Sequence, residues 1–467
     1  MAVPPKPRRK SIFGGLLWVV IGSLLLANNL GAQFGFWEML FNWWPLLLIL
    51  LGLGKLFEHY AATRSGEPPA RLLSGGEIFL LILLFLMAGA YTGIVHIAGD
   101  DIDLDLPWWN PYTITEEAKA PAKPNSKIVI EVPRGNVTLH PEDIAEIRVV
   151  ANKSLRAQDE AEAEQIAKNY GVTVRESGGV FEVRGTTPTL REFDNNKFPK
   201  IRRGRWGQGR VSIDLEVHVP RQSNVDIRTE RGAITVNGLA GNLATNSRSR
   251  DVEIRDVTGN VDVEVRGGDI HVTNTKGDVR LSGSGGQVDI ADVTGQAQVN
   301  GEYSGPIRFK NVAKEVRFNS RRSDITLSTL KGTLELSSSD MEIFEAGNVN
   351  VSTSNYSIIV ENPTGRVVAD NKNGDIVLRY NAPPAADVEI NNERADVEIT
   401  MPQKAEFTVD ASSRNGRAES DFKDGVRITE GEREGERDGK IEGKVGQRGP
   451  TIKVRTTTGT VRLRQSN

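Results

Sequence analysis

The chain of 467 residues contains no cysteine, few aromatic residues and five histidines. Without cysteine it forms no disulfide, uses no thiol in catalysis and holds no cysteine-ligated metal. No two histidines lie at the i, i+4 spacing that places two ligands on one face of a helix; they are His59, His96, His140, His218 and His271. We therefore expect no metal site and no other cofactor.

A strong charge of one sign is also absent. Lys and Arg total 58 against 61 Asp and Glu, so the net charge is −3 and no basic field indicates nucleic-acid binding. The sequence lacks a Gly-x-Ser-x-Gly elbow, a Walker loop and a dinucleotide fingerprint in the strand-to-helix context that each requires. Parallel β-helices include polysaccharide lyases and hydrolases, but the outward aspartates here recur at one strand position in many repeats, which is typical of a solvated face. We therefore expect that the protein is not an enzyme.

Long apolar runs occur only before residue 110. Residues 12–30, 39–56 and 78–97 form three such runs. At 1.5 Å per residue they approach or reach the length needed to cross a hydrocarbon core of about 30 Å. The first run is long and lacks a cleavage site, which favours a retained helix over a signal peptide. The second is short enough for a re-entrant segment, although the basic residues after it favour a full crossing.

The charges that flank these runs predict their orientation. A basic amino-terminal tail stays in the cytoplasm, so three crossings place everything after about Gly99 outside it. We expect a multi-pass protein of the cytoplasmic membrane, with the lipid bilayer as a partner and an extracytoplasmic C-terminal domain. The expected parts are a cytoplasmic tail, a transmembrane hairpin, a cytoplasmic loop, a third transmembrane helix, a linker, an irregular β cap region with one helix, a regular β-solenoid and a region of looser β repeats: residues 1–11, 12–57, 58–77, 78–98, 99–126, 127–230, 231–380 and 381–467.

From Gly232 onward the sequence repeats with a nine-residue period. The unit glycine-x-aliphatic-x-aliphatic starts at positions 232, 241, 250, 259, 268, 277, 286 and 295, with Arg250 once in place of glycine. Alternation within each unit is typical of a strand with one face in a core and the other in water. The seventh residue after each unit start is apolar in one set, such as Leu239 and Val257, and polar in the other, such as Arg248. The true repeat therefore spans two units, with two strands and two unlike edges.

These patterns predict membrane helices plus an all-β domain: an N-terminal three-helix anchor and a C-terminal parallel β-solenoid with about 18 residues per coil. Coils that stack at about 4.8 Å bury a continuous core, and roughly eight would form a rod on the order of 40 Å long. We expect the units at Ser323 and Gly332 to continue the parallel stack. An antiparallel sandwich is the alternative, but hairpins do not explain why turn character alternates from unit to unit. Residues 427–449, charged and glycine-rich, are predicted to be disordered or a long loop before strands that close the solenoid.

Two stretches resemble known families. Within residues 11–57, the sequences IFGGLLWVVIG, LANNLG and WWPLLLILLGLG are similar to the LiaI/LiaF-type transmembrane region. That region accompanies envelope-stress and cell-wall-antibiotic response proteins, which implies a sensing role beside a membrane sensor kinase. From about residue 127 to residue 467, NVDIRTERGAITV and the repeated Gly-Asp-Ile and Gly-Asp-Val units resemble the bacterial adhesin-like β-strand-repeat family. Its function is unknown, so the resemblance implies an architecture and carries over no catalytic residue.

The candidate site is the polar edge of the repeats. Its arginines are expected to stack in neighbouring coils and to bind an anionic envelope polymer through bidentate contacts; they are Arg248, Arg250, Arg266, Arg321 and Arg322. The alternative is a solvated rim whose field is partly cancelled by nearby acids. The expected function is recognition of a protein or envelope polymer by a repetitive surface. Regulation of a sensor kinase and self-association into an envelope scaffold are the alternatives.

Overall fold

The computed structural model describes residues 110–157, 159–186, 211–433 and 436–466. The three predicted membrane helices and the segments that join them, residues 1–98, lie outside these ranges. Across the residues that the structure describes, no helix is both long enough and apolar enough to cross a bilayer. Strands dominate these ranges, and α4 (Glu160–Lys168) is the one helix within them.

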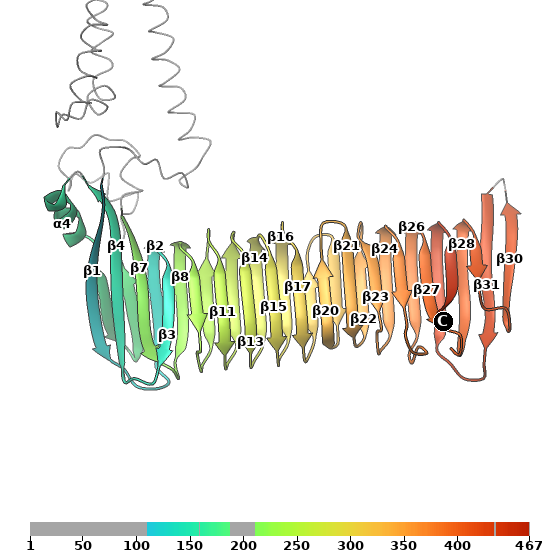
Figure 1. Ribbon diagram of the computed structural model, residues 1–467, viewed down its shortest axis with the longest axis horizontal. Helices are drawn as coiled ribbons and strands as arrows, with labels where there is room; N and C mark the ends of the chain where they lie inside the picture. Colours follow the sequence, from blue (N-terminus) through green and yellow to red (C-terminus); the bar gives the residue numbers. More distant parts are fainter. Residues whose placement is uncertain (1–109, 158, 187–210, 434–435, 467) are drawn as a thin grey trace, which may run out of the picture. The chain divides into compact units, whose positions relative to one another are not determined.

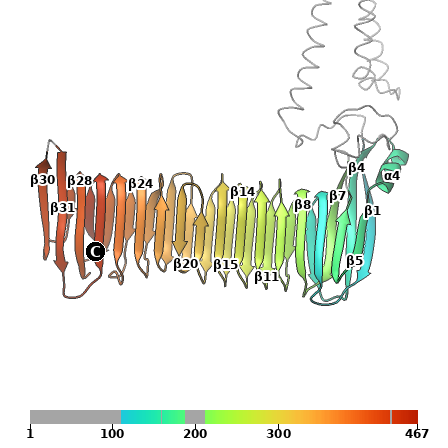
Figure 2. The same cartoon turned by 180° about the vertical axis from the view of Figure 1, so that it is seen from behind.

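Two long sheets face each other along a rod (Figure 1; Figure 2). In spatial order, sheet A contains β1 (Asn110–Pro121), β4 (Glu146–Ala157), β7 (Val211–Pro220), β3 (Val137–Glu142), β9 (Ile234–Asn237), β11 (Val252–Val257), β13 (Ile270–Thr275), β15 (Val288–Val293), β17 (Ile307–Val312), β20 (Leu330–Leu336), β21 (Asp340–Ala346), β23 (Ser357–Glu361), β25 (Ile376–Arg379), β27 (Val397–Pro402), β33 (Val461–Ser466) and β29 (Ala418–Ser420). Its 16 strands, at about 4.8 Å each, make a stack on the order of 70 Å long.

Sheet B is built in the same way. Its strands, ordered by their pairings, are β5 (Val172–Ser177), β6 (Val180–Gly185), β2 (Lys127–Arg134), β8 (Asn224–Arg231), β10 (Leu243–Ser247), β12 (Val261–Arg266), β14 (Val279–Gly285), β16 (Ala297–Tyr303), β18 (Val316–Asn319), β19 (Ser323–Leu327), β22 (Val349–Thr353), β24 (Val367–Asn373), β26 (Val388–Arg394), β32 (Thr451–Thr458), β28 (Phe407–Asn415), β31 (Glu436–Val445) and β30 (Val426–Arg433). The rod is longer than the sequence predicts because both its cap and its closing region add strands to the stack.

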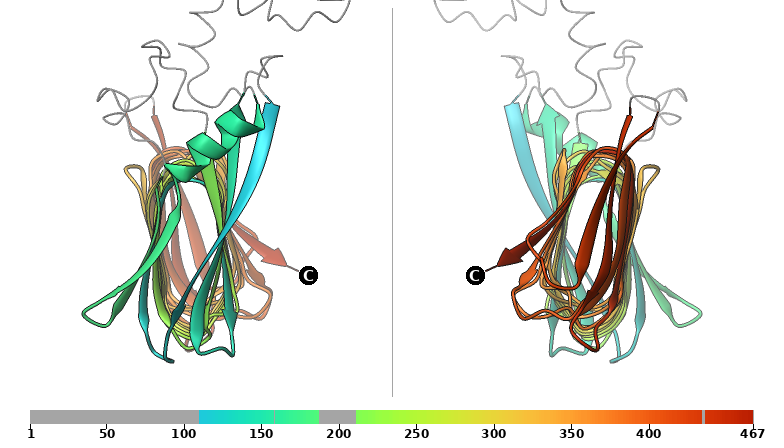
Figure 3. Two further views of the ribbon diagram at one scale, coloured as in Figure 1. Left: turned by 90° about the vertical axis from the view of Figure 1, so that its left-hand side faces the viewer. Right: turned by 90° about the vertical axis from the view of Figure 1, so that its right-hand side faces the viewer.

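Successive coils pair in parallel, so that each strand residue lies beside its equivalent one coil along. Val261 in β12, for example, pairs with Leu243 in β10 on one side and Val279 in β14 on the other. Inward side chains such as Val263 are fully buried between the sheets, and the end-on views show the two sheets enclosing this core (Figure 3). The predicted β-solenoid, with its two-unit coil, is confirmed for this region.

The two edges of the coil differ as the sequence predicts. At one edge Val257, Thr275 and Val293 lie in register and are 0–2% exposed. Asn274, which precedes Thr275, has a φ of +53°, and Asp292, which precedes Val293, has a φ of +56°. Asn and Asp tolerate this left-handed conformation better than most residues. At the other edge the equivalent residues, Arg248 among them, are exposed.

The close stacking of coils leaves no room for a side chain at some bends. Gly283 has a φ of +125°, and a Cβ atom there would lie 1.8 Å from the carbonyl oxygen of Val265 in the preceding coil. Its register partner Gly301 has a φ of +143° and meets Gly283 in the same way. Only glycine combines this conformation with this close approach of backbones.

We predict that Gly283→Ala lowers the free energy of unfolding by about 2 kcal/mol or more, because it adds both a clash and backbone strain. The adjacent exposed substitution Ser284→Ala is the control and should change stability by less than about 0.5 kcal/mol. Urea denaturation monitored by circular dichroism would measure both. Equal stability of the two variants would contradict the account of the bend.

One coil runs in the opposite direction to its neighbours. β19 is antiparallel to both β18 and β22, and β20 is antiparallel to both β17 and β21. The prediction that the units at Ser323 and Gly332 continue the parallel stack is therefore wrong. A two-residue alternation is the same in both chain directions, so the hydrophobic pattern cannot distinguish them. The first reversal is a tight turn in which the Ser320 hydroxyl accepts a hydrogen bond from the backbone N–H of Ser323 (3.2 Å).

Neither the first nor the last coil of the sequence lies where chain order would place it. β2 lies between β6 and β8, and β3 lies between β7 and β9. At the other end β32 lies between β26 and β28, and β33 lies between β27 and β29. The final strands thus do not cap the solenoid, as the sequence suggests, but are inserted one coil inside it.

Two predicted irregular segments contain strands. β30 and β31 form an antiparallel hairpin that begins at Val426 and ends at Val445, over most of the stretch 427–449 where we expect a loop or disorder, and β31 also pairs with β28. These strands are charged and largely exposed, so backbone pairing to the solenoid stabilises them and a hydrophobic pattern does not reveal them. β1, residues 110–121, similarly lies within the predicted linker, residues 99–126. At that end the helix α4 lies beside the strands (Figure 3).

Candidate functional site

A polar groove of about 520 Å³ lies along sheet B toward its C-terminal end. Its lining residues come from six neighbouring strands, in the order β22, β24, β26, β32, β28 and β31. At a spacing of about 4.8 Å per strand, the groove extends roughly 24 Å along the rod. It follows the polar edge, which we define here as the turns where the chain passes from sheet B to sheet A.

A row of buried polar side chains lies beneath the groove, one from each of five strands: Thr353, Asn371, Asn392, Thr456 and Ser413. The side-chain amide of Asn371 donates to the carbonyl oxygens of Tyr356 (2.8 Å) and Gly374 (3.1 Å). The amide of Asn392 donates to Gly374 (3.1 Å) and Ala395 (3.3 Å) in the same manner. These bonds satisfy carbonyls that the sheet ladders leave open, and they fix the bends that shape the groove.

Charged side chains of both signs line the groove. Lys372, Glu393 and Arg414 are exposed and form no ion pair with another described residue. Lys440 is paired with Glu442. The acids Asp370 and Asp438 also line the groove, are exposed and form no ion pair with another described residue, so unpaired charges of both signs are free to bind a ligand.

Arg455 in the groove contacts Asp410 of the adjacent strand β28. Its guanidinium is paired with the carboxylate of Asp410 in the adjacent strand and also donates to the backbone oxygen of Asp410 (2.8 Å). The hydrogen bond from Arg455 lowers the pKa of Asp410 below its usual value, against a smaller opposing effect of burial. The pair fixes β32 against β28 at the centre of the groove.

We predict that this pair stabilises the protein at neutral pH and not in strong acid. Because the pKa of Asp410 is depressed in the folded state, the contribution is complete above the unfolded pKa of about 4 and is lost as the pH falls through the folded value. Asp410→Asn should therefore cost up to about 1 kcal/mol near pH 7 and much less near pH 2.5. Urea denaturation at both pH values would measure this, with exposed Asp262→Asn as control. A cost that does not depend on pH would contradict the assignment.

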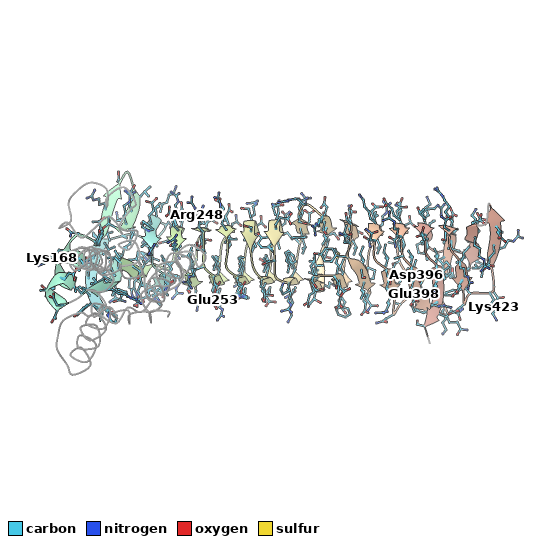
Figure 4. The ribbon with its side chains drawn as sticks, turned by 90° about the horizontal axis from the view of Figure 1, so that it is seen from above. Lys168, Arg248, Glu253, Asp396, Glu398 and Lys423 are labelled. Carbon is cyan, nitrogen blue, oxygen red and sulfur yellow. The ribbon has the colours of Figure 1, made fainter. Side chains whose placement is uncertain are left out.

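The predicted arginine column is interrupted in the structure. Arg248 and Arg266 are neighbours along the polar edge, but Ser284 and Glu302 occupy the next two places in the row. The Nη1 atom of Arg248 lies 3.7 Å from Oε1 of Glu230, with which it forms an ion pair. Figure 4 shows Arg248 on the side of sheet B and Glu253 on the side of sheet A. The interspersed acids match the alternative of a solvated rim, and anionic binding by these residues stays a prediction.

Arg321 continues this row beyond Glu302, whereas Arg250 and Arg322 lie beside the row. Arg250 follows Arg248 in the turn toward sheet A, and Arg321 and Arg322 lie in the hairpin turn between β18 and β19. The backbone N–H of Arg321 donates to the carboxylate of Glu302 (2.7 Å). The structure therefore brings the five residues to one edge of the rod but not into one continuous column.

The groove lies on the edge that the sequence indicates, but several coils beyond Arg248 and Arg266 toward the C-terminal end. Thr353, Asn371 and Asn392 occupy the strand position that Ser247 occupies in the regular repeats. A signal was present, since asparagine at a position that is otherwise small or aliphatic is a departure from the repeat. The contributions of β32 and β31 could not be found in this way, because their neighbours in space are distant in sequence.

Two histidines that appear isolated in the sequence are adjacent in the cap region. The rings of His140 in β3 and His218 in β7 stack with 4.9 Å between centroids. His218 Nδ1 lies 2.6 Å from Glu142 Oε1, and this hydrogen bond lowers the pKa of Glu142. Among the residues that the structure describes, no group of three or more His, Cys, Asp or Glu side chains could hold a metal ion.

The fold and the groove define an extended two-sheet β-solenoid with a polar surface along one edge. The chain belongs to the Toastrack DUF4097 family, whose model matches residues 125–464. The LiaF transmembrane domain matches residues 13–100, so the chain joins a Toastrack domain to a membrane region. No curated protein matches the chain.

Solved structures that align with the chain share little sequence with it. A candidate cell adhesion protein from Clostridium sporogenes is 10% identical, covers 76% of this chain and 100% of its own, and has a TM-score of 0.17. A candidate lipid-binding protein from Parabacteroides distasonis is 10% identical, with 75% and 96% covered and a TM-score of 0.25. A candidate adhesin from Bacteroides fragilis is 12% identical, with 75% and 97% covered and a TM-score of 0.16.

Proposed function

We propose that the protein is a membrane-anchored binding module that holds an extended, hydrophilic envelope polymer along its groove outside the cytoplasm. The observation that carries the proposal is the shape of the groove, which crosses six strands of sheet B parallel to the axis of the rod. A compact ligand would need an enclosed pocket, whereas an elongated groove suits a chain. The LiaF-like region supports attachment to a membrane.

The lining residues indicate the chemistry of the polymer. Lys372 and Arg414 would bind carboxylates or phosphates, and Glu393 would bind ammonium or hydroxyl groups. Asn391 and Ser412, which lie on either side of Arg455 in the sheet, add neutral hydrogen-bonding groups. No aromatic side chain is among the lining residues, so recognition rests on charge and hydrogen bonds and should weaken with salt. A glycan strand that carries amide, carboxylate and amine groups has all the required features.

The proposal includes binding without chemical conversion of the polymer. No histidine is among the residues that line the groove. Its basic and acidic side chains come from five strands, whereas a glycosidase needs two carboxyl groups flanking a single bond. Their distribution suits an extended contact in which many weak interactions add.

We predict that Lys372→Ala together with Arg414→Ala weakens binding to soluble peptide-bearing cell-wall glycan by at least about tenfold, since two charge-assisted contacts are lost. Full-length protein in lipid nanodiscs would be tested by biolayer interferometry on immobilised glycan. The matched control is Arg248→Ala with Arg266→Ala, on the same edge but outside the groove, and it should change the affinity less than about twofold.

The control also tests the arginine edge directly. Equal losses for both double variants would show that net charge alone drives binding, and the groove would not be the site. Loss with only the Arg248 and Arg266 variant would favour the arginine edge as the ligand site. No binding by the unaltered protein to the glycan or to a polyanionic wall polymer would overturn the polymer proposal.

The match to the LiaF transmembrane domain favours a second candidate, a regulatory partner of a membrane sensor kinase. In-cell crosslinking with mass spectrometry, with and without cell-wall stress, would test it. Recovery of a kinase that requires residues 13–100 would support regulation. Recovery of other copies of the chain alone would favour the scaffold alternative.

A further inference from the structure

The last coil of the sequence is inserted between two coils that precede it in the chain. β32 pairs in parallel with β26 on one side and β28 on the other, and β33 pairs with β27 and β29. In the chain this coil follows β28 to β31, to which the short segment 446–450 joins it. The coils on either side are therefore separated by a slot one strand wide in each sheet, which residues 451–466 fill.

Charge distinguishes this coil from those around it. Residues 451–466 contain four basic residues and no acidic one. Arg462 donates to Asp396 (2.6 Å) on the β27 side, and Arg464 donates to Glu419 (2.7 Å) on the β29 side. Asp387 also accepts the backbone N–H of Thr451 (2.7 Å). A basic coil thus fills an acidic slot, an electrostatic complementarity that is typical of a docked segment.

The flanking coils are matched to each other as well as to the inserted coil. Val388 in β26 and Val409 in β28 both pair with Ile452, and Ile390 and Ala411 both pair with Val454. If β32 and β33 left, β28 could dock directly on β26 with its inward side chains in register. Closure of the slot would restore the backbone pairing, so departure of the coil does not leave two open sheet edges.

We propose that residues 451–466 form a detachable coil that inserts into this acidic slot, and that its insertion completes the groove. Arg455, Thr456 and Thr457 of β32 line the middle of the groove, between residues of β26 and β28. Removal of the coil therefore takes out a central strand of the six and shortens the site. This second part of the inference rests on the proposed function, whereas the exchange of the coil does not.

The absence of cysteine from the chain provides a clean test. Val454→Cys places one thiol at a fully buried position of the coil, and Val272→Cys places one at an equally buried position in β13. Full-length protein in nanodiscs would be exposed to a thiol reagent at low temperature without denaturant. We expect Val454→Cys to react at least about tenfold faster, because local detachment exposes it while Val272→Cys needs wider unfolding.

Salt should separate this detachment from general loosening. Raising the NaCl concentration from about 0.1 to about 0.5 M screens the ion pairs across the slot and should increase the labelling rate of Val454→Cys, with little change for Val272→Cys. Adding Arg464→Ala to the Val454→Cys variant should have the same effect, whereas Arg379→Ala, which removes a 2.6 Å pair with Glu361 in the regular stack, should not. Equal labelling rates for the two thiols would overturn the proposal.

Binding of glycan tests whether insertion of residues 451–466 completes the groove. Saturating cell-wall glycan should slow the labelling of Val454→Cys at least about threefold, because only the inserted state presents the complete site. Glycan that binds without slowing the labelling would overturn the link and leave the proposed function intact. Fast, salt-dependent labelling without any glycan binding would support the detachable coil and contradict the proposed function.

Discussion

The structure depends on backbone hydrogen bonding between successive coils in two facing sheets. Each strand satisfies its N–H and C=O groups only through the strands on either side of it, so the strands of neighbouring coils stay in phase even where the length of a coil changes from 18 to 19 or 21 residues. The offset of 18 residues between pairs in the regular part of the stack and the close approach at Gly283 both follow from this stacking. A coil buries its aliphatic face only by stacking, which explains why a chain without cysteine can form a long rod.

Backbone pairing between coils is compatible with changes in strand direction and in strand order. Backbone pairing accepts either strand direction, so the coil formed by β19 and β20 runs backwards without interrupting either sheet. Pairing is also indifferent to chain order, so β32 and β33 lie inside the stack rather than at its end. The groove depends on this exchange of strand order, because its central strand β32 comes from the end of the chain. The strand β31 of the charged hairpin lines the far end of the groove.

The proposed binding surface lies on an edge of the rod. The flat faces of the sheets carry many paired charges, whereas the bends of the polar edge carry Lys372, Glu393 and Arg414 without described ion partners. A repeated edge suits a repeated ligand, since each coil adds one set of contacts at a fixed interval. The Toastrack domain and the LiaF-like region together place this surface in a membrane-attached protein.

The sequence by itself determined the local and periodic features: the strand alternation, the length of one coil, the buried apolar edge at Val257 and the exposed polar edge at Arg248. These features depend on residues a few positions or one coil apart. Strand direction at Ser323, the strands within residues 427–449 and the position of residues 451–466 were decided only in the tertiary structure. The physical reason is that alternating apolar and polar residues look the same whichever way a strand runs. Backbone hydrogen bonds, in turn, do not depend on which side chains the paired strands carry. A single sequence therefore contains no signal for either strand direction or strand order.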